Sequence, residues 1–228
     1  DGGTPGMDSE ERREALAKET FGHPREDVLE HLRRLPRRYA SSVSARQVAD
    51  HLHLVRTLSA IRRCAVKASD QGSHWDLVVV SADCPGLLAR ICAALTSLRL
   101  SILSAQVYTR FDGVVIDLFS VVAGDSSLFA DDSSFASLVE ERVSHVRELE
   151  LPALQEWVED HASRWAIAAS RIMTPKPRVE FHDQDSDDYT ILDITGPDRF
   201  GLLFDLTLYL SRRQWVIHSA RVCTEADK

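Results

Sequence analysis

The feature that most constrains this chain is an internal duplication. Residues 83–112 align with residues 198–227 without a gap, at a constant offset of 115 positions, as from Asp83 to Asp198. A repeat of this kind indicates two copies of one folding unit, with the same elements in the same order. The matched pairs are Asp83/Asp198, Gly86/Gly201, Leu87/Leu202, Leu88/Leu203, Leu95/Leu210, Ile102/Ile217, Ser104/Ser219, Ala105/Ala220, Val107/Val222, Thr109/Thr224 and Asp112/Asp227.

The first copy has the pattern of a strand, a helix and two further strands. Its continuous Leu-Val run is typical of a buried strand, and the leucines after the turn recur at helical spacing. Together with the later elements this predicts a ferredoxin-like βαββαβ unit, in which two helices cover one antiparallel sheet. The expected elements are strands at 77–80, 100–109, 114–122 and 178–182, helices at 87–98, 135–149 and 152–165, and turns at 83–86 and 111–113.

The second copy repeats only the start of this unit, with a strand at 189–195, a helix at 202–210 and a strand at 215–224. We therefore expect it to be truncated, with an unpaired strand edge and an uncovered apolar face. Before the first copy, apolar residues at helical spacing predict helices, one of which begins at a capping box formed by Ser44 and Gln47. The predicted fold class is α+β: two ferredoxin-like units in tandem, the second incomplete, after an N-terminal helical segment. The expected boundaries are 1–70, 75–183 and 187–228.

The charge balance excludes some partners. Lysine and arginine number 27 against 35 aspartates and glutamates, for a formal net charge of −8. Such a surface does not favour nucleic acid or an anionic membrane. No apolar run of about 18 residues is present and the N-terminal residues do not form a secretory signal, so we expect a cytoplasmic location. The cysteines form no CxxC pair, which predicts reduced thiols without a metal: Cys64, Cys84, Cys92 and Cys223.

The two turns carry a recognisable motif. The peptides DCPGLLARI at 83–91 and DRFGLLFDL at 198–206 resemble the opening motif of ACT domains, and the strands at 102–113 and 217–228 are similar to their second strands. Two such domains in tandem, preceded by LPRRY at 35–39 and VADHL, resemble the C-terminal region of the bifunctional PII uridylyltransferase/uridylyl-removing enzyme family. The resemblance covers most of residues 26–228.

This resemblance implies a regulatory region. In that family a nucleotidyltransferase domain attaches UMP to the signalling protein PII when glutamine is low, an HD domain removes it when glutamine is high, and ACT domains sense glutamine. Mg²⁺ and UTP would serve the catalytic part, and no cofactor is expected in these residues. The chain lacks a nucleotidyltransferase G-S plus D-x-D pattern, and Asp50-His51 reverses an HD pair. We expect no catalytic site, glutamine as ligand, PII as a partner through the parent enzyme, and ACT–ACT pairing.

Each turn has features that suit an amino acid. A glycine that opens a helix lets the backbone approach a ligand, and the bare N–H groups of the first helical turn favour a carboxylate. The preceding aspartate suits an ammonium group, and serines of the second strand add polar contacts. The alternative is that each aspartate caps its helix and each glycine only permits the turn. The candidate ligand-binding residues are Asp83, Cys84, Pro85, Gly86, Leu87, Ser101 and Ser104, and Asp198, Arg199, Phe200, Gly201 and Leu202.

Departures from the ACT pattern predict that the two sites are unequal. Phe200 replaces a proline that is common in this turn, and Val216 stands where ligand-binding ACT domains often carry asparagine, which argues against the second site. A second function stays open: a stand-alone ACT-repeat protein that serves as an oligomerisation or docking module without ligand. An RNA-binding sheet is disfavoured by charge and by the lack of RNP-type aromatics. Asp183, Asp185 and Asp187 begin like a calcium loop but lack its glycine and glutamate.

Overall fold

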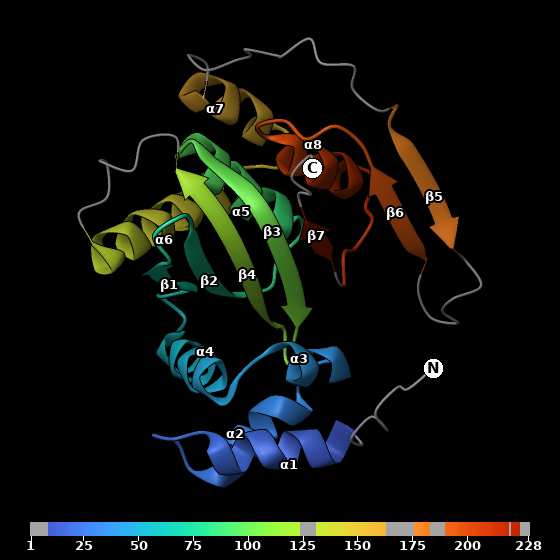
Figure 1. Cartoon of the computed structure of the whole chain (residues 1–228). Helices are drawn as coiled ribbons and strands as arrows, with labels where there is room; N and C mark the ends of the chain where they lie inside the picture. The colour runs from blue at the N-terminus through green and yellow to red at the C-terminus, as the bar shows by residue number, and fades with distance from the viewer. Residues whose placement is uncertain (1–8, 124–130, 163–175, 183–189, 219, 224–228) are drawn as a thin grey trace.

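The computed structural model describes residues 9–123, 131–162, 176–182, 190–218 and 220–223. Within them the chain forms a group of N-terminal helices, a five-stranded antiparallel sheet covered by further helices, and a two-stranded sheet (Figure 1). The aspartate-rich segment at 183–187 lies outside the described residues.

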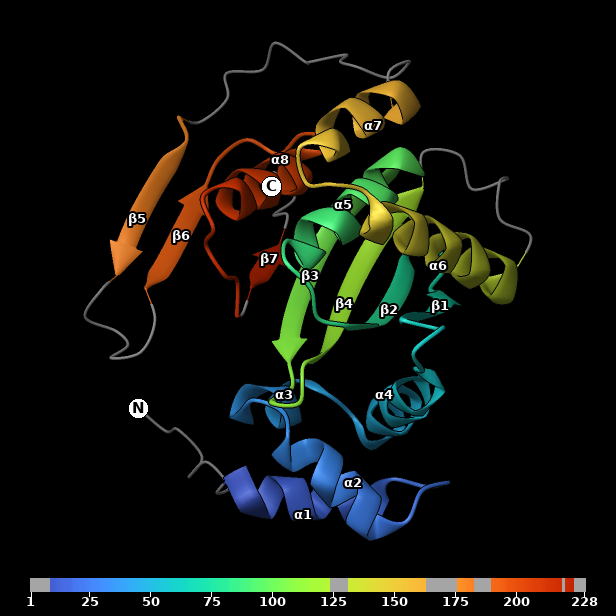
Figure 2. The same ribbon diagram turned by 180° about the vertical axis from the view of Figure 1, so that it is seen from behind.

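Four helices precede the sheet: α1 (Ser9–Glu19), α2 (Arg25–Arg33), α3 (Arg37–Ser42) and α4 (Ala45–Thr57). The predicted capping box of α4 is confirmed, because Ser44 Oγ accepts a hydrogen bond from the Gln47 N–H at 3.3 Å and Gln47 Oε1 accepts one from the Ser44 N–H at 2.9 Å. The helices pack beneath one end of the sheet (Figure 2). There they bury Val80, Tyr108 and Ile116. The N-terminal segment therefore shares a hydrophobic core with the first unit.

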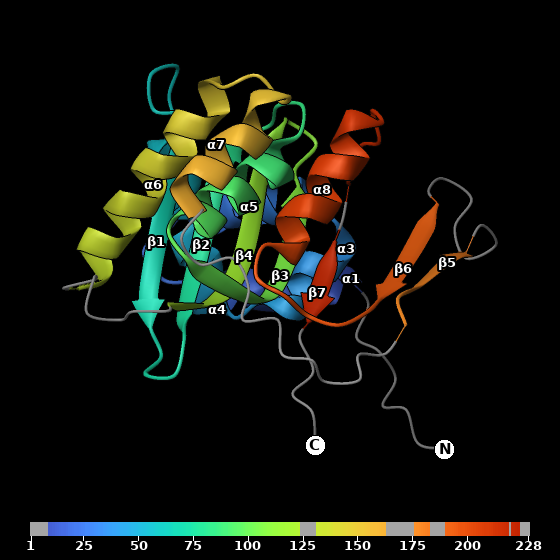
Figure 3. The ribbon, with the colours of Figure 1, turned by 90° about the horizontal axis from the view of Figure 1, so that it is seen from above.

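The five-stranded sheet has the order β1-β2-β4-β3-β7, and all its neighbours are antiparallel. Helices α5, α6, α7 and α8 lie on the face opposite the N-terminal helices (Figure 3). The elements are β1 (Cys64–Asp70), β2 (Trp75–Ala82), α5 (Leu87–Ser97), β3 (Leu100–Thr109), β4 (Val114–Ala123), α6 (Asp132–Glu148), α7 (Ala153–Ala162), α8 (Leu202–Arg212) and β7 (Arg221–Cys223).

The expectation that the N-terminal segment is helical through residue 70 is wrong for its last residues, because Cys64–Asp70 form strand β1. The strand contains a single β-branched residue, Val66, so its local signal is weak and its pairing with β2 determines its conformation. Acidic side chains of α6 cover its outer edge: Glu140 accepts from the Val66 N–H and Asp132 from the Asp70 N–H, both at 3.1 Å. Helix α6 therefore closes this edge to further strands.

The strand at 178–182 does not complete the first unit, contrary to expectation. β5 (Arg178–His182) pairs instead with β6 (Ile191–Thr195) in the two-stranded sheet, since β1 already lies beside β2. Hairpin β5–β6 thus corresponds to hairpin β1–β2, α8 to α5 and β7 to part of β3. The repeated unit therefore begins with a hairpin in both copies.

The uncovered apolar face expected for the second unit lies on hairpin β5–β6. Val179, Phe181 and Ile194 share one face of this hairpin and are 54%, 57% and 42% exposed. The corresponding first-unit pair, Val66 and Val79, is buried beneath the helices. Among the described residues the second unit has no counterpart of α6 to cover this face.

Candidate functional site

The two glycine turns have nearly the same backbone. We call residues 83–86 glycine turn 1 and residues 198–201 glycine turn 2. Gly86 has φ 68° and ψ 24°, and Gly201 has φ 75° and ψ 3°, both in the left-handed region that glycine adopts without strain. In each turn the N–H of the first helical residue donates to the carbonyl three residues earlier, at 3.0 Å in α5 and 3.1 Å in α8. The predicted glycine-opened helices are therefore both present.

Each helix begins with bare backbone donors. Among the described residues, no hydrogen-bond acceptor lies within reach of the N–H groups of Leu88 and Ala89 in α5, or of Leu203 and Phe204 in α8. Asp83 is exposed and accepts no hydrogen bond from α5 in the described part of the chain. The alternative in which this aspartate caps its helix is therefore wrong for glycine turn 1.

Glycine turn 1 is covered by the protein itself. A Cβ atom added to Gly86 would lie 2.6 Å from Leu151 Cδ2 and 3.3 Å from Leu151 Cδ1. Leu151 belongs to the connection between α6 and α7, and it packs against the main core. An apolar side chain therefore occupies the position from which a ligand would approach Gly86.

A buried arginine holds this cover in place. Arg90, in the first turns of α5, is only 8% exposed and donates from Nη1 to the carbonyl oxygens of Val146 at 2.7 Å and Leu149 at 2.5 Å, and from Nε to that of Pro85 at 3.2 Å. These contacts satisfy carbonyl groups at the C-terminal end of α6, where a positive charge is favourable. The counterpart of Arg90 in the second copy is Asp205, which is exposed and pairs with Arg199 at 2.5 Å.

Glycine turn 2 lies beside the C-terminal part of α5. The nearest atom to a Cβ added to Gly201 would be Thr96 Cγ2, at 3.6 Å, which is ordinary van der Waals contact. Thr96 is buried, while Asp198, Arg199 and Phe200 are exposed, Phe200 by 39%. In contrast to turn 1, no leucine of the described residues lies within 4 Å of a Cβ added to this glycine, and two charged residues and an aromatic residue precede it in the turn.

The two copies meet along what we call the seam, which consists of the contact between α5 and α8 and the pairing of β3 with β7. The 115-position offset equates Cys92 with Thr207, and these two side chains interact across the helix contact. It also equates Gln106 with Arg221, which are paired across the strands. Each residue meets its own counterpart, so the copies are related by an internal pseudo-twofold axis that passes through both contacts.

Of the other predicted site residues, the two serines lie in strand β3. Ser104 lies at the seam, paired with Cys223 of β7 and Ser120 of β4, and Ser101 lies further along β3, paired with Val122. Within the described residues, neither serine hydrogen-bonds to a glycine turn. Cys84 and Leu202 are partly buried, Pro85 is exposed, and Leu87 is buried in the core, where its role is packing.

Sequence reasoning missed a buried carboxyl group beneath α5. Asp117 of β4 is fully buried on the helix-facing side of the sheet, and neither of its oxygens has a hydrogen-bond partner among the described residues. Burial, and to a smaller extent the charge of Asp83, raises the pKa of Asp117 well above its usual range. Its position in a strand of valines and phenylalanine was the available signal.

The described residues contain no group of three or more histidine, cysteine, aspartate or glutamate side chains that could hold a metal ion. Cys64, Cys84, Cys92 and Cys223 are all free thiols, with Cys64 and Cys92 buried, Cys84 half-buried and Cys223 exposed. No described helix has the length and apolar character needed to cross a bilayer.

Comparison with known proteins agrees with this architecture. Residues 75–143 match the family model "Plant bHLH transcription factor, ACT-like domain". The chain is also similar to proteins named bifunctional uridylyltransferase/uridylyl-removing enzyme. One from Rhodopseudomonas palustris is 33% identical over 72% of this chain and 19% of the relative. One from Gluconobacter oxydans is 32% identical over 65% and 16%, and one from Bradyrhizobium diazoefficiens is 33% identical over 72% and 18%. No solved structure matches.

The fold, the glycine-opened helices and the family match together define an ACT-domain protein. More particularly, the chain is similar over much of its length to proteins named bifunctional uridylyltransferase/uridylyl-removing enzyme. It spans less than a fifth of the length of the curated relatives named here, at 16 to 19%.

Proposed function

We propose that this chain is the amino-acid-sensing regulatory region of a uridylyltransferase/uridylyl-removing enzyme, and that glutamine is its ligand. The names of the relatives support the enzyme class, and the tandem ACT fold supports a regulatory role. A ligand that binds one arrangement of the two units more tightly than another would shift the balance between these arrangements. Catalysis, with Mg²⁺, UTP and the substrate PII, belongs in this proposal to other parts of the parent protein, in the cytoplasm.

The observation that carries the proposal is the setting of glycine turn 2. It combines the bare N–H groups of Leu203 and Phe204, an exposed aspartate at Asp198, and a position at the seam beside Thr96. The backbone donors suit the α-carboxylate of an amino acid, and the aspartate suits its ammonium group. Glycine turn 1 has the same backbone but is covered by Leu151. We therefore propose one ligand at turn 2 for each chain, the reverse of the preference that Phe200 and Val216 indicated.

Isothermal titration calorimetry tests this proposal with the full chain and millimolar glutamine. Gly201→Ala adds a methyl group at the turn and is expected to weaken binding by at least about tenfold, which corresponds to roughly 1.4 kcal/mol. Gly72→Ala is the matched control, because Gly72 has a similar φ of 80° in the β1–β2 hairpin with nothing within 4 Å of the added atom. No heat with the wild-type chain, or equal binding by the two variants, contradicts the proposal.

A second candidate function is an interaction module that works without a ligand. The covered turn 1 and the exposed apolar face of hairpin β5–β6 favour it. Under this function the chain associates through that face, whether or not glutamine is present. Sedimentation velocity of the wild type and of Phe181→Ser, with and without glutamine, separates the two functions. The interaction module is supported if the wild-type chain associates, if Phe181→Ser abolishes this association, and if glutamine does not change it.

A further inference from the structure

Strand β3 makes contacts with two parts of the molecule that are distant in sequence. Along residues 104–106 its outer edge pairs with β7 of the second unit. From Val107 to Arg110 the same strand and the hairpin that follows contact the N-terminal helices. The seam and the N-terminal segment therefore share one strand, with no element between them.

Val107 is the residue at which these contacts meet. Its N–H donates to the carbonyl oxygen of Ala220, just before β7, at 3.2 Å. Its carbonyl oxygen accepts a hydrogen bond from Arg38 Nη2 of α3 at 2.6 Å. In an antiparallel ladder the N–H and the C=O of one residue face the same neighbouring strand. The Arg38 guanidinium therefore reaches the same edge of β3 that β7 uses.

Aromatic packing fixes Arg38 and α3 on this strand. The Arg38 guanidinium carbon lies 5.0 Å from the centroid of the Tyr108 ring, a cation–π distance. The next residue of α3, Tyr39, packs edge-on against Tyr108 at 5.2 Å between centroids. Tyr108 in turn donates its hydroxyl to Gln106 Oε1 at 2.6 Å, and Gln106 is the seam residue that pairs with Arg221. Two routes thus connect α3 with the seam ladder.

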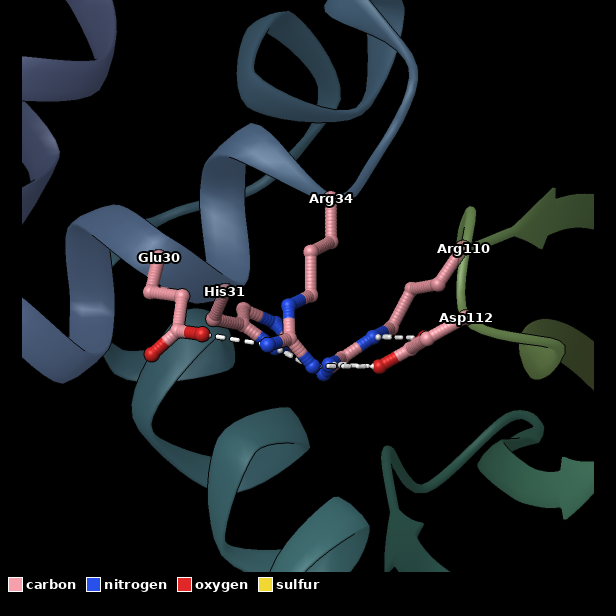
Figure 4. A network of polar contacts seen from close by, with 5 residues as sticks. All are labelled: Glu30, His31, Arg34, Arg110 and Asp112. Atoms are coloured by element: carbon pink, nitrogen blue, oxygen red, sulfur yellow. Dashed lines mark hydrogen bonds and ion pairs between the residues drawn. The ribbon is translucent and has the colours of Figure 1, made fainter.

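A polar network, buried at His31 and Arg110, anchors α2 on the hairpin after β3 (Figure 4). Arg110 Nη1 donates to His31 Nδ1 at 2.9 Å, and its other nitrogens donate to Asp112 at 2.9 and 2.7 Å. Arg34 also donates to Asp112, at 2.6 Å, and pairs with Glu30. Because arginine can only donate, His31 carries its proton on Nε2 and can donate to the Tyr39 hydroxyl at 3.4 Å.

The same network of hydrogen bonds continues to α4. The Tyr39 hydroxyl donates to His51 Nδ1 at 2.7 Å. Burial lowers the pKa of His31 to about 3 and that of His51 to about 4, so both rings are neutral acceptors at neutral pH. Helices α2, α3 and α4 are therefore held to β3 and its hairpin by groups that have fixed donor directions. Such an anchor is specific for one position of the helices on the strand.

We infer that β3 couples the seam to the N-terminal helices: the pairing of β7 with β3 and the docking of α3 on β3 stabilise each other, with Arg38 as the positioning residue. A change in the arrangement of the two units at the seam then changes how firmly α3 docks on β3. In the same way, a displacement of α3 changes the pairing of β7 with β3. The coupling is reciprocal by thermodynamic necessity. It goes beyond the proposed function, because it depends on no ligand.

Hydrogen–deuterium exchange of the full chain, read by mass spectrometry, tests this inference. Arg38→Met keeps an unbranched side chain but removes the donor, and is expected to speed exchange in β7 roughly tenfold, the size that a lost charge-assisted hydrogen bond gives. The matched control is Arg37→Met, since Arg37 is exposed and makes no side-chain hydrogen bond or ion pair within the described residues. Exchange in β1 and β2 is expected to stay unchanged in both variants.

The reverse experiment perturbs the seam and reads α3. Val222→Pro removes one backbone donor from the short strand β7 and is expected to speed exchange in residues 37–42. Val179→Pro, which disrupts the separate β5–β6 hairpin, is the control and should leave α3 unchanged. Equal β7 exchange in the Arg38 and Arg37 variants overturns the inference. So does α3 protection that survives Val222→Pro, or a loss of protection by Arg38→Met that extends equally to β1 and β2.

Discussion

Glycine turns 1 and 2 share a backbone and differ in what surrounds them. Gly86 faces Leu151, whereas Gly201 faces Thr96 across the seam. The turn itself is therefore not what decides whether a helix end is open to a ligand. In the first copy the helix end is closed by Leu151, which follows α6 and lies about 60 positions further along the chain.

The origin of this difference lies at one pair of matched positions. Arg90 is buried and holds the end of α6 against α5, while Asp205 is exposed and pairs with Arg199. The described second unit has no counterpart of α6 for Asp205 to bind. The comparison teaches that a duplicated motif keeps its backbone geometry while its neighbours assign it a different role.

Removal of Arg90 is the strongest way to break this comparison. Arg90→Met leaves the carbonyl groups of Val146 and Leu149 without their donor, and is expected to lower the free energy of unfolding by about 3 kcal/mol. Asp205→Asn, at the matched exposed position, is expected to change it by less than about 0.5 kcal/mol. Urea denaturation measures both. Similar losses in the two variants would show that Arg90 does not distinguish the copies.

Substitution of the two glycines comes next in size. Gly86→Ala combines left-handed strain with a contact of 2.6 Å to Leu151, and is expected to cost about 2 to 3 kcal/mol. Gly201→Ala meets only ordinary contact with Thr96 and is expected to cost about 1 kcal/mol. Thermal unfolding of each variant gives the ranking. A larger loss at Gly201 would mean that turn 2, not turn 1, is the more tightly packed.

Acid tests the opposite face of the sheet, where the N-terminal helices cover the first unit. Burial lowers the pKa of His51 to about 4, below its unfolded value, so its stabilising effect is present above about pH 6.5 and is lost as pH falls toward 4. The loss from this group is about 2 kcal/mol at pH 5. His51→Asn, whose amide oxygen can accept from Tyr39, should flatten the pH dependence of unfolding. The exposed His53→Asn on the same helix should not.

Removal of the cover over turn 1 is expected to have a small effect on stability and a clear effect on binding. Leu151→Ala is expected to cost about 1 kcal/mol, because the side chain is only partly buried. If turn 1 is then equivalent to turn 2, the number of glutamine molecules bound per chain should rise from one to two in calorimetry. Leu58→Ala, a partly buried leucine of the N-terminal segment, is the control. An unchanged stoichiometry would show that Leu151 is not what closes turn 1.

Local sequence signals were enough to predict several elements. The glycine turns, the helices after them, the capping box of Ser44 and Gln47 and the hairpin at Gly113 all follow from residues within a few positions of one another. The pairing partner of the strand at 178–182 could not be predicted, because it depends on β1, a strand with one β-branched residue. Strand pairing is decided by tertiary contacts that a local pattern does not contain.

The state of each turn was also beyond the local pattern. Leu151 reaches Gly86 only because α6 folds back over α5, and no spacing in the sequence shows this. One signal was present: a matched position holds arginine in one copy and aspartate in the other. A charge reversal within otherwise matched leucines indicates that the two positions have different surroundings. Asp117 gave a similar signal, as a lone acid among valine and phenylalanine.

The pairing of Gln106 with Arg221 and of Cys92 with Thr207 has a consequence for how such a molecule can evolve. In a dimer of two identical chains, a residue on the rotation axis must meet a copy of itself, so every substitution there is made twice. A covalent tandem is free from that restriction, and each half can acquire substitutions on its own. One half can then become a fixed support while the other remains available to a small molecule.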